Sequence, residues 1–499
     1  MPLFLPTPCL VPIRTLRHTG RGFGGVMKGL NLLLGVGCLV VLACNGKENG
    51  ASDSNPVADS GDHTDSGEPG DTGDAIQDCG TITTFEDGRS PTATLHVSPT
   101  GSDTASGTEA DPLSLSAAIQ NATPGVAVVV HAGTYNGGIY VSDVRGTETA
   151  PIWIGGAEGE ATPVISGGNT GMQMSGLSWV VLHDLQVEGA RDNGVNLDDQ
   201  GSYNDETVAH HVVVRGLSIS DIGGDGNQDC LKLSGVRDIW VLDSAFSRCG
   251  GGISGSGVDM VGCHRVEIAR NDFSDLSANA MQAKGGTSEV DFHWNTVRDA
   301  GERGVNMGGS TDFAYFRPPL STAKTNTEAS NIRVWSNIFE GSIAAVAYVG
   351  CVDCLVANNT IVDPTNWIGR ILQETTSRDG YTFAEVQNGR FVNNLVYYDR
   401  SQLSTHEDFN IGPDTQPETF EFTTNLWYAH DQPSESAPTL PVKETGGISG
   451  EDPQFVDGHH ITQDSPAASA GTALDDVWGD IDGRCYGTVP SIGAHAVNE

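Results

Sequence analysis

Short segments in which apolar and polar residues alternate recur along most of the chain, separated by glycine, asparagine and aspartate. Alternation with a two-residue period is typical of a β-strand that buries one face, and the residues between the segments favour turns. The sequence therefore predicts many short strands from about residue 94 onward. The clearest segments can be aligned with one another: Val180–Leu185, Val212–Leu217, Ile239–Ser244, Val266–Asn271, Val290–Asn295, Ile332–Asn337 and Cys354–Asn359.

Asparagine recurs at the end of these segments, at a spacing that defines the repeat. Several adjacent members of the series are 22 to 27 residues apart, as from Asn337 to Asn359 and from Ser244 to Asn271, and longer gaps indicate loops inserted between strands. That period fits one coil of a parallel β-solenoid with three short strands, whereas a propeller blade needs about forty residues. Asparagine tolerates left-handed backbone at a bend, and stacked copies can hydrogen-bond along the axis. We therefore expect a structural ladder made of Asn271, Asn295, Asn337, Asn359 and Asn394.

A second pattern, Gly-x-Asp/Asn followed by an apolar residue, begins one strand of several coils. The middle polar residue of each such strand should point outward, so that stacked coils gather one such side chain each in a groove. These outward side chains form a predicted column of Asn196, Lys232, Asp259, Gln282 and Asn306. Lys284 and Asp198 flank the column, and Arg303 begins the strand of Asn306.

The long insertion from residue 310 to 330 should stand beside this groove. It contains Tyr315 and Arg317 within an aromatic stretch. Aromatic rings and guanidinium groups are suited to stacking on sugars, so we expect a wall of a glycan site. The alternative is an apolar lid that seals the sheet.

Composition narrows the function. The chain has 499 residues and 64 Asp+Glu against 26 Lys+Arg, which gives a formal net charge of −38. A chain this acidic would be repelled by the phosphates of a nucleic acid, so we expect no nucleic-acid partner. The glycine-rich, sparsely charged composition excludes a helical bundle. Only six lysines occur, so Lys232 and Lys284 in a patterned column carry more information than lysines usually do.

The amino-terminal residues resemble a bacterial lipoprotein signal. A basic start at Met27–Lys28 precedes an apolar run that ends in Val41–Cys44. The resemblance implies cleavage before Cys44 and lipid on that residue, with Met27 as the true start; a secretory peptide without lipid is the alternative. We expect a signal over 1–43, an acidic, disordered linker over 44–90 and a β-domain over 91–499, exported and lipid-anchored at the outer membrane or cell surface.

Seven cysteines remain beyond Cys44, which leaves at least one unpaired within the chain. Export permits disulfides, but their pairing stays open at this stage.

Three motifs resemble the amino-terminal region of secreted right-handed parallel β-helix proteins with the pectin lyase-like fold: Leu95–Asp103, Ala132–Tyr135 and Gly146–Ile152. Residues 452–456, 465–467 and 492–494 are similar to the closing coil of such proteins. The resemblance implies an all-β, right-handed, single-stranded parallel β-helix with three short strands per coil.

Two lyase families share site motifs with the chain. Lys284 and Arg303 resemble the lysine base and arginine partner of polysaccharide lyase family six. The segments 192–196 and 229–235 resemble family nine, pectate lyases with an acidic calcium cluster and a lysine base. This second resemblance implies Lys232 as the base and Ca²⁺ held by Asp192, Asn196 and Asp229.

The predicted function is therefore binding of a polysaccharide in the groove and β-elimination of uronic-acid units by a monomer. That reaction needs a group that neutralises the carboxylate, a base for the C5 proton and an acid for the leaving oxygen. Lys284, Lys232 and Arg303 are the candidate catalytic residues, and the candidate substrate contacts are Asn306, Gln282, Asp259, Tyr315 and Arg317. A non-catalytic glycan-binding or adhesive surface protein and a glycoside hydrolase remain as alternatives.

Overall fold

The computed structural model describes residues 79–497, apart from 225, 253 and 404–406. These residues belong to the second of two compact units, Gly73–Glu499. The predicted signal over 1–43, the lipidation site Cys44 and most of the linker lie outside the described residues.

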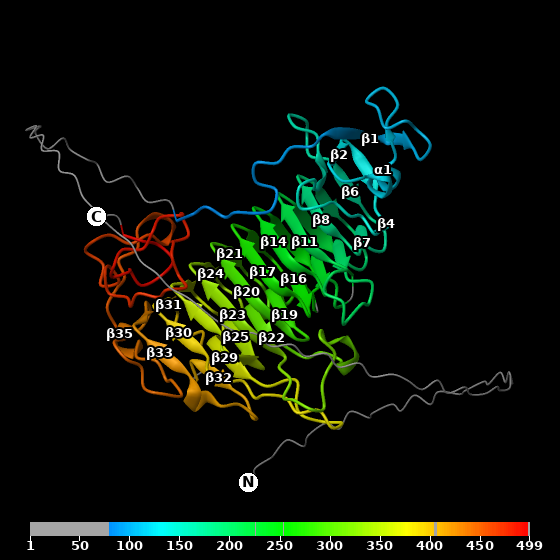
Figure 1. Cartoon of the computed structure of the whole chain (residues 1–499). Helices are drawn as coiled ribbons and strands as arrows, with labels where there is room; N and C mark the ends of the chain where they lie inside the picture. Colours follow the sequence, from blue (N-terminus) through cyan, green and yellow to red (C-terminus); the bar gives the residue numbers. More distant parts are fainter. Residues whose placement is uncertain (1–78, 225, 253, 404–406, 498–499) are drawn as a thin grey trace, which may run out of the picture. The chain divides into compact units, whose positions relative to one another are not determined.

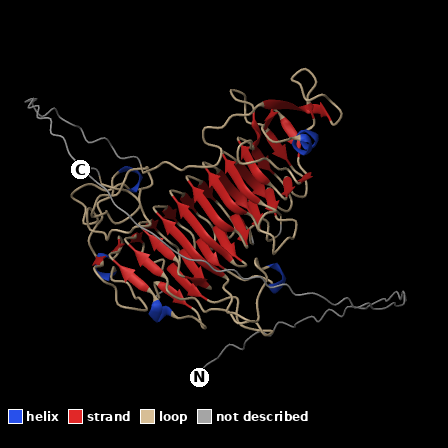
Figure 2. Ribbon diagram, in the orientation of Figure 1, coloured by secondary structure: helices blue, strands red, loops and turns tan. Residues whose placement is uncertain are grey.

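Over the described residues the strands stack into three parallel sheets, and the chain passes from one sheet to the next in every coil (Figures 1 and 2). The thirteen-strand sheet consists of β1 (Ala93–Ser102), β2 (Val126–Val130), β5 (Ile152–Gly156), β8 (Ser178–His183), β11 (His210–Arg215), β14 (Arg237–Leu242), β17 (His264–Ala269), β20 (Thr287–His293), β23 (Ala329–Trp335), β26 (Cys351–Val352), β27 (Leu355–Ala357), β30 (Arg390–Val392) and β33 (Glu421–Thr423). The ten-strand sheet consists of β4 (Ile139–Ser142), β7 (Met172–Ser175), β10 (Val195–Asp198), β13 (Leu231–Ser234), β16 (Ser256–Val261), β19 (Asn279–Lys284), β22 (Arg303–Gly308), β25 (Ala344–Val349), β29 (Trp367–Leu372) and β32 (Phe409–Ile411). The twelve-strand sheet consists of β3 (Thr134–Asn136), β6 (Val164–Ser166), β9 (Gln186–Glu188), β12 (Ser218–Ile222), β15 (Ala245–Cys249), β18 (Asp272–Ser274), β21 (Thr296–Arg298), β24 (Ile338–Glu340), β28 (Thr360–Val362), β31 (Leu395–Tyr398), β34 (Leu426–Ala429) and β35 (Ile448–Ser449).

The predicted repeat is confirmed. The aligned alternating segments form β8, β11, β14, β17, β20, β23 and β27, which are consecutive along the main path of the thirteen-strand sheet. Their inward side chains are buried with those of the other two sheets. Phe246 and Phe273 stack there with ring centroids 5.0 Å apart. A continuous apolar interior along the axis is what holds such a solenoid together, because no single coil buries its own apolar face.

The asparagine ladder is also confirmed, and it is longer than predicted. The Oδ1 of Asn295 accepts hydrogen bonds from the backbone N–H and the Nδ2 of Asn271, at 2.9 and 3.0 Å. The same pattern continues from Asn295 up the stack and ends at Asn425, where the Nδ2 of Asn394 donates at 3.1 Å. The left-handed backbone lies one residue before each ladder member, as at Trp294 with φ 56°. The asparagines therefore satisfy buried backbone groups at the bend and do not adopt the left-handed conformation themselves.

The two ends of the described chain pack on the outside of the β-helix. At the amino-terminal end, helix α1 (Leu115–Asn121) contacts β1, β2 and β4. The residues from Cys79 to 90 fall within the range that the sequence analysis assigned to the linker, but Phe85 packs edge-on against Trp179 at 5.3 Å. A disulfide joins Cys79 to Cys485. The folded part of the chain therefore extends at least to Cys79.

The expected closing coil does not form. After β35 no strand follows among the described residues, and the remaining segment packs on the outside of the stack: Phe455 lies against Tyr397 of the twelve-strand sheet, and Val477 joins a cluster on the thirteen-strand sheet. There the backbone carbonyl of Gly479 accepts hydrogen bonds from Trp294 Nε1 at 3.2 Å and from Ser336 Oγ at 2.9 Å. The segment covers Trp335 and Leu355, whose apolar surfaces would otherwise face water. It therefore closes the side of the stack rather than its end.

The odd number of cysteines leaves one buried thiol. Besides the bond between the chain ends, disulfides join Cys230 to Cys249 and Cys351 to Cys354. Cys263 is free and fully buried, and burial raises the pKa of its thiol to about 11. It acts as a small apolar core residue.

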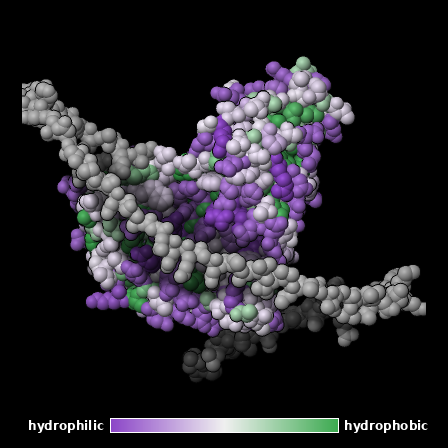
Figure 3. Space-filling model, in the orientation of Figure 1, coloured by the Kyte–Doolittle hydropathy of each residue, from purple (hydrophilic) through white to green (hydrophobic). Residues whose placement is uncertain are grey.

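The described surface is strongly polar. On the face shown in Figure 3, hydrophilic residues predominate and apolar residues form only small separate patches. Within the described part of the chain, none of the helices has the length and apolar composition needed to span a membrane.

Candidate functional site

The register of the ten-strand sheet produces the predicted polar column. Asn196 pairs with Lys232, Lys232 with Asp259, Asp259 with Gln282, and Gln282 with Asn306. These positions all face outward, because residues two apart on a strand share a face and the intervening residues fill the core. The column therefore lies along the outer face of the sheet.

Two lysines and two aspartates form a compact charged cluster in this column. The Nζ of Lys232 lies 3.3 Å from Asp229 Oδ2 and is also paired with Asp259 Oδ2. The Nζ of Lys284 lies 3.3 Å from the other oxygen of Asp259, Oδ1, and 3.2 Å from Gln282 Oε1. Asp259 therefore lies between the two ammonium groups and contacts both.

Burial changes the acid–base behaviour of both lysines. Their side chains are only 18% (Lys232) and 12% (Lys284) exposed. Loss of hydration lowers the pKa of Lys232 below its usual 10.5; the charge of Lys284 lowers it further, while Asp229 opposes the shift. Burial also lowers the pKa of Lys284, against the opposing charges of Asp229, Glu328 and Glu374. Burial is the largest cause of the lowered pKa in both lysines, and each has the other's ammonium nearby, so both are candidates for the group that loses its proton.

The insertion between β22 and β23 forms one wall of a cavity above the lysines. Its Arg317 donates from Nε and Nη2 to both oxygens of Asp199, at 2.7 and 2.9 Å, and its guanidinium stacks 4.2 Å from the ring centre of Tyr203. Tyr315 lies on the same wall with half of its surface exposed. The buried carboxylate of Glu328 accepts the Gly285 N–H at 3.0 Å, which fixes the foot of the insertion next to Lys284. The insertion is thus a wall beside the sheet and not a lid across it.

The cavity has a volume of about 660 Å³ and balanced charge. Its lining includes three acidic and three basic residues: Asp198, Asp199, Asp312, Lys232, Lys284 and Arg317. The sum is zero, in a chain whose formal net charge is −38. Asp229 and Asp259, which contact the two lysines from behind the lining, are not in this sum, so it describes only the groups that face the cavity.

Several predicted site residues lie outside this lining. Asp259 and Asn306 belong to the column, but each is only 1% exposed. They are covered by neighbouring side chains and cannot contact a substrate directly. Gln282 contacts Lys284 but is likewise outside the lining. Their places as substrate contacts are thus not supported.

Arg303 is also separated from the cavity. It lies in register with Asn279, at the opposite end of the strand pair from Lys284. Its guanidinium donates to Asn306 Oδ1 at 3.0 Å and pairs with Glu374 at 3.1 Å. The expected partnership of Lys284 and Arg303 at one reacting centre does not form, because strand direction places them several residues apart.

The structure places the predicted calcium ligands in separate contacts. Asp229 Oδ1 accepts the Ser256 N–H at 2.8 Å, and its Oδ2 faces the Lys232 ammonium. Asn196 donates its amide to Gln173 and to Asp198, and Asp192 is exposed. A calcium ion needs six to eight oxygen ligands directed at one point, and both oxygens of Asp229 are already used within the protein. We therefore assign no step to calcium.

Asp199 and Tyr203 are functional-site residues that the sequence analysis missed. They follow β10 in a polar loop with no repeat pattern. Only the fold reveals them, because their partner Arg317 is 118 residues away in sequence.

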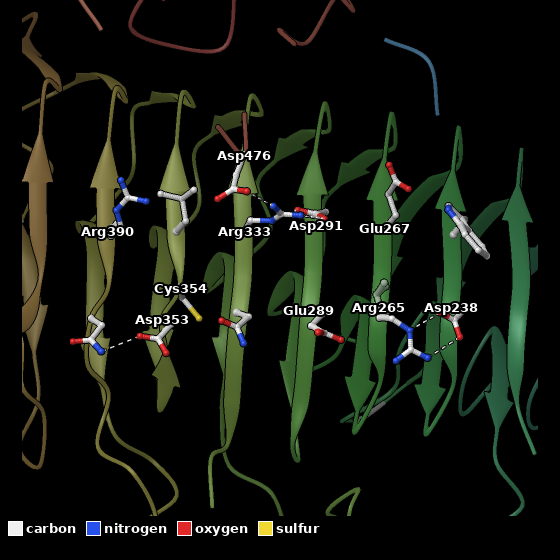
Figure 4. Close-up of a pocket in the computed structure, with 15 residues that line it drawn as sticks. Asp238, Arg265, Glu267, Glu289, Asp291, Arg333, Asp353, Cys354, Arg390 and Asp476 are labelled. Atoms are coloured by element: carbon white, nitrogen blue, oxygen red, sulfur yellow. Dashed lines mark hydrogen bonds and ion pairs between the residues drawn. The ribbon is translucent and has the colours of Figure 1, made fainter. Parts of the chain in front are cut away.

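A larger hollow, of about 750 Å³, lies on the thirteen-strand sheet. Figure 4 shows two rows of charged side chains crossing successive strands. Arg265 donates to both oxygens of Asp238, at 2.6 and 2.8 Å, and Arg333 does the same with Asp291 at 2.7 and 2.6 Å. Each arginine is thus held by a carboxylate on the preceding strand.

Comparison with known proteins gives the fold independently. A family model described as the Pel9A-like right-handed β-helix region matches residues 95–234. The solved structure of pectate lyase Pel9A is 16% identical over 84% of this chain and 100% of its own, with a TM-score of 0.51.

This chain is a right-handed parallel β-helix. A second solved β-helix, XylC in complex with xylose, is 11% identical over 81% of this chain and 98% of its own, with a TM-score of 0.50. No curated protein matches the sequence. The matched region of the family model ends at Ser234, two residues after Lys232, so it includes one lysine of the cluster and the strands from β1 to β13.

Proposed function

We propose that this β-helix binds a uronic-acid-containing polysaccharide in the cavity of the ten-strand sheet and cleaves it by β-elimination, with Lys232 as the base. The observation that carries the proposal is the pair of buried lysines on either side of Asp259, open to a cavity of about 660 Å³. A lysine with a lowered pKa is a neutral amine for a larger fraction of the time at working pH, as proton abstraction requires.

The two lysines would have different tasks. We assign Lys284 the task of neutralising the substrate carboxylate as an ammonium, since Asp229, Glu328 and Glu374 oppose the lowering of its pKa that burial causes. The neutral Lys232 amine takes the C5 proton. The electron pair then forms the C4–C5 double bond, the bond from C4 to the glycosidic oxygen breaks, and that oxygen takes a proton from solvent.

The wall of the cavity would position the sugar. Tyr315 offers an exposed ring for stacking, and the ion pair between Arg317 and Asp199 fixes the wall against the sheet. This arrangement suits an extended polymer that lies along the groove.

The test follows the absorbance of the unsaturated product after the full chain is mixed with pectate, alginate and chondroitin. Lys232→Ala should abolish the signal, while Lys443→Ala, on an exposed surface, serves as the matched control. A flat trace for the intact wild type on every uronate would contradict the lyase and favour glycan binding without cleavage.

Export with a lipid on Cys44, and a monomeric state, are further parts of the proposal. Three disulfides in the described residues support an oxidising location. Incorporation of labelled fatty acid that Cys44→Ala prevents would test the anchor.

A further inference from the structure

Two histidines and an aspartate converge in the C-terminal segment, apart from the sheet cavity. His460 Nε2 lies 3.0 Å from Asp482 Oδ2, and His495 Nδ1 lies 3.2 Å from the same oxygen. The three potential ligand atoms all lie within 4.8 Å of one another. They come from three separate turns, and Asp480 joins two of these by accepting the N–H groups of Asp482 and Ala496.

The other nitrogen of each ring faces a backbone carbonyl. His460 Nδ1 lies 2.6 Å from the oxygen of Asp457, and His495 Nε2 lies 3.2 Å from that of Gly458. A carbonyl can only accept, so each of these nitrogens must carry the proton. In a neutral imidazole, the nitrogen that faces Asp482 then has a lone pair and no hydrogen.

That lone pair points at a carboxylate, which is also an acceptor. Hydrogen bonding alone would need both rings to be imidazolium ions, although they stack with centroids 3.7 Å apart. Arg484 would add a third cation on the same Asp482 oxygen, at 3.1 Å. Two carboxylates, Asp482 and the adjacent Asp480, would then offset three positive charges at close range. A cation between the two lone pairs and the carboxylate satisfies every group with neutral rings.

The spacing suits a small divalent transition metal. Ligands at about 2.0–2.2 Å from a tetrahedral zinc lie about 3.3–3.6 Å from one another, close to the two separations found here. Imidazole nitrogen favours zinc and similar ions over calcium or magnesium. Histidine ligands commonly donate their second N–H to a backbone carbonyl, as both rings do here.

We propose that His460 Nε2, His495 Nδ1 and one oxygen of Asp482 form a zinc-binding site. His460 and Arg484 also line a cavity of about 450 Å³, so a water or a small ligand has room to complete the coordination. Arg484, whose side chain is 39% exposed, turns into solvent when the metal replaces it at the carboxylate. The site would tie together the turns that lie beside the disulfide between Cys79 and Cys485. It is independent of the proposed glycan chemistry.

The test is zinc binding to the full chain after treatment with a chelator, measured by calorimetry and by metal analysis after dialysis. His460→Gln and Asp482→Asn remove ligands that are 38% and 32% exposed, so they leave the fold intact. His459→Gln is the matched control, because this neighbouring histidine faces Glu340 and not the cluster. Circular dichroism checks that each variant is folded, and cobalt(II) absorption reports tetrahedral geometry.

The expected result is one zinc ion per chain at this site, a loss of affinity of about a hundredfold or more in both ligand variants, and wild-type affinity in the control. A thermal midpoint that rises with zinc only in the wild type and the control would agree. Absence of zinc binding, or equal binding in His460→Gln and Asp482→Asn, would overturn the proposal.

Discussion

The cavity of the ten-strand sheet and the hollow of the thirteen-strand sheet are both lined by charged residues from stacked coils, yet their charges behave differently. In the hollow, Arg265 is 48% exposed, and its hydrogen bonds to Asp238 raise the pKa of its guanidinium. In the cavity, Lys232 is 18% exposed, and burial lowers its pKa although it contacts two aspartates. On the same scaffold, the charged form of a basic side chain is thus stabilised where water reaches it and destabilised where water is excluded.

This difference distinguishes ion pairs with a structural role from charged groups suited to catalysis. An exposed ion pair on stacked strands contributes about 1 kcal/mol or less. Burying a lysine costs desolvation energy. The protein keeps such a lysine only where ion pairs and hydrogen bonds around it offset that cost. The cavity is therefore the better candidate for catalysis, even though the hollow is larger.

The strongest way to break the comparison is Lys232→Arg. An arginine keeps the positive charge but stays protonated, so it cannot act as the base. We expect the rate of uronate cleavage to fall about 10²–10⁴-fold, the usual contribution of a general base. Initial rates of product absorbance measure it.

Arg265→Lys, in the hollow, is the control and should leave the rate unchanged. Retention of most of the activity by Lys232→Arg would remove Lys232 from the role of base. Lys284→Arg, which preserves the neutralising charge, should keep more activity than Lys284→Ala.

Asp259→Asn should show the largest effect on stability. It leaves two buried ammonium groups without their shared carboxylate, and breaking a buried pair costs about 3–5 kcal/mol. Asp238→Asn, in the hollow, should cost about 1 kcal/mol or less. Denaturant unfolding of both variants compares the two, and equal costs would show that burial does not distinguish the faces.

The lowered pKa of Lys232 should also appear in the pH dependence of activity and stability. Because the pKa of Lys232 lies below 10.5 in the folded protein, kcat/KM should rise with pH through that lowered value, by up to about tenfold per unit. The folded state also binds fewer protons than the unfolded state between the two pKa values, so stability should rise with pH there. A rate that falls as the pH increases over this range would contradict the assignment.

Salt should produce the smallest effect. At about 1 M ionic strength the screening length is about 3 Å. The cost of Asp238→Asn should then fall toward zero, while the cost of Asp259→Asn should persist because its pair is shielded from solvent. Unfolding titrations at low and high salt check this, and equal screening of both would place Asp259 in contact with water.

Much of the fold could be predicted from local pattern. The column from Asn196 to Asn306 followed from a two-residue period and one outward side chain per coil, and the sheet register confirms it. The asparagine ladder followed from the same period.

The features that were wrong or missed depend on long-range packing. The pairing of Arg317 with Asp199 links residues 118 positions apart, and the Cys79–Cys485 bond links residues 406 positions apart. No closing coil formed because the C-terminal segment instead packs on the side of the stack, where it buries Trp294 and Trp335. The role given to Arg303 failed because family spacing does not record the end of the strand at which a side chain lies.

Direct titration of the lysine amines tests the central claim most clearly. The chain has only six lysines, so their side-chain nitrogen signals can be assigned in a labelled sample by comparison with Lys232→Arg and Lys284→Arg. The account predicts that the two signals lost in these variants titrate below 10.5. Titration of both at or above that value would show that the cavity stabilises the protonated lysines, as the hollow stabilises its arginines. That result would contradict a lysine base.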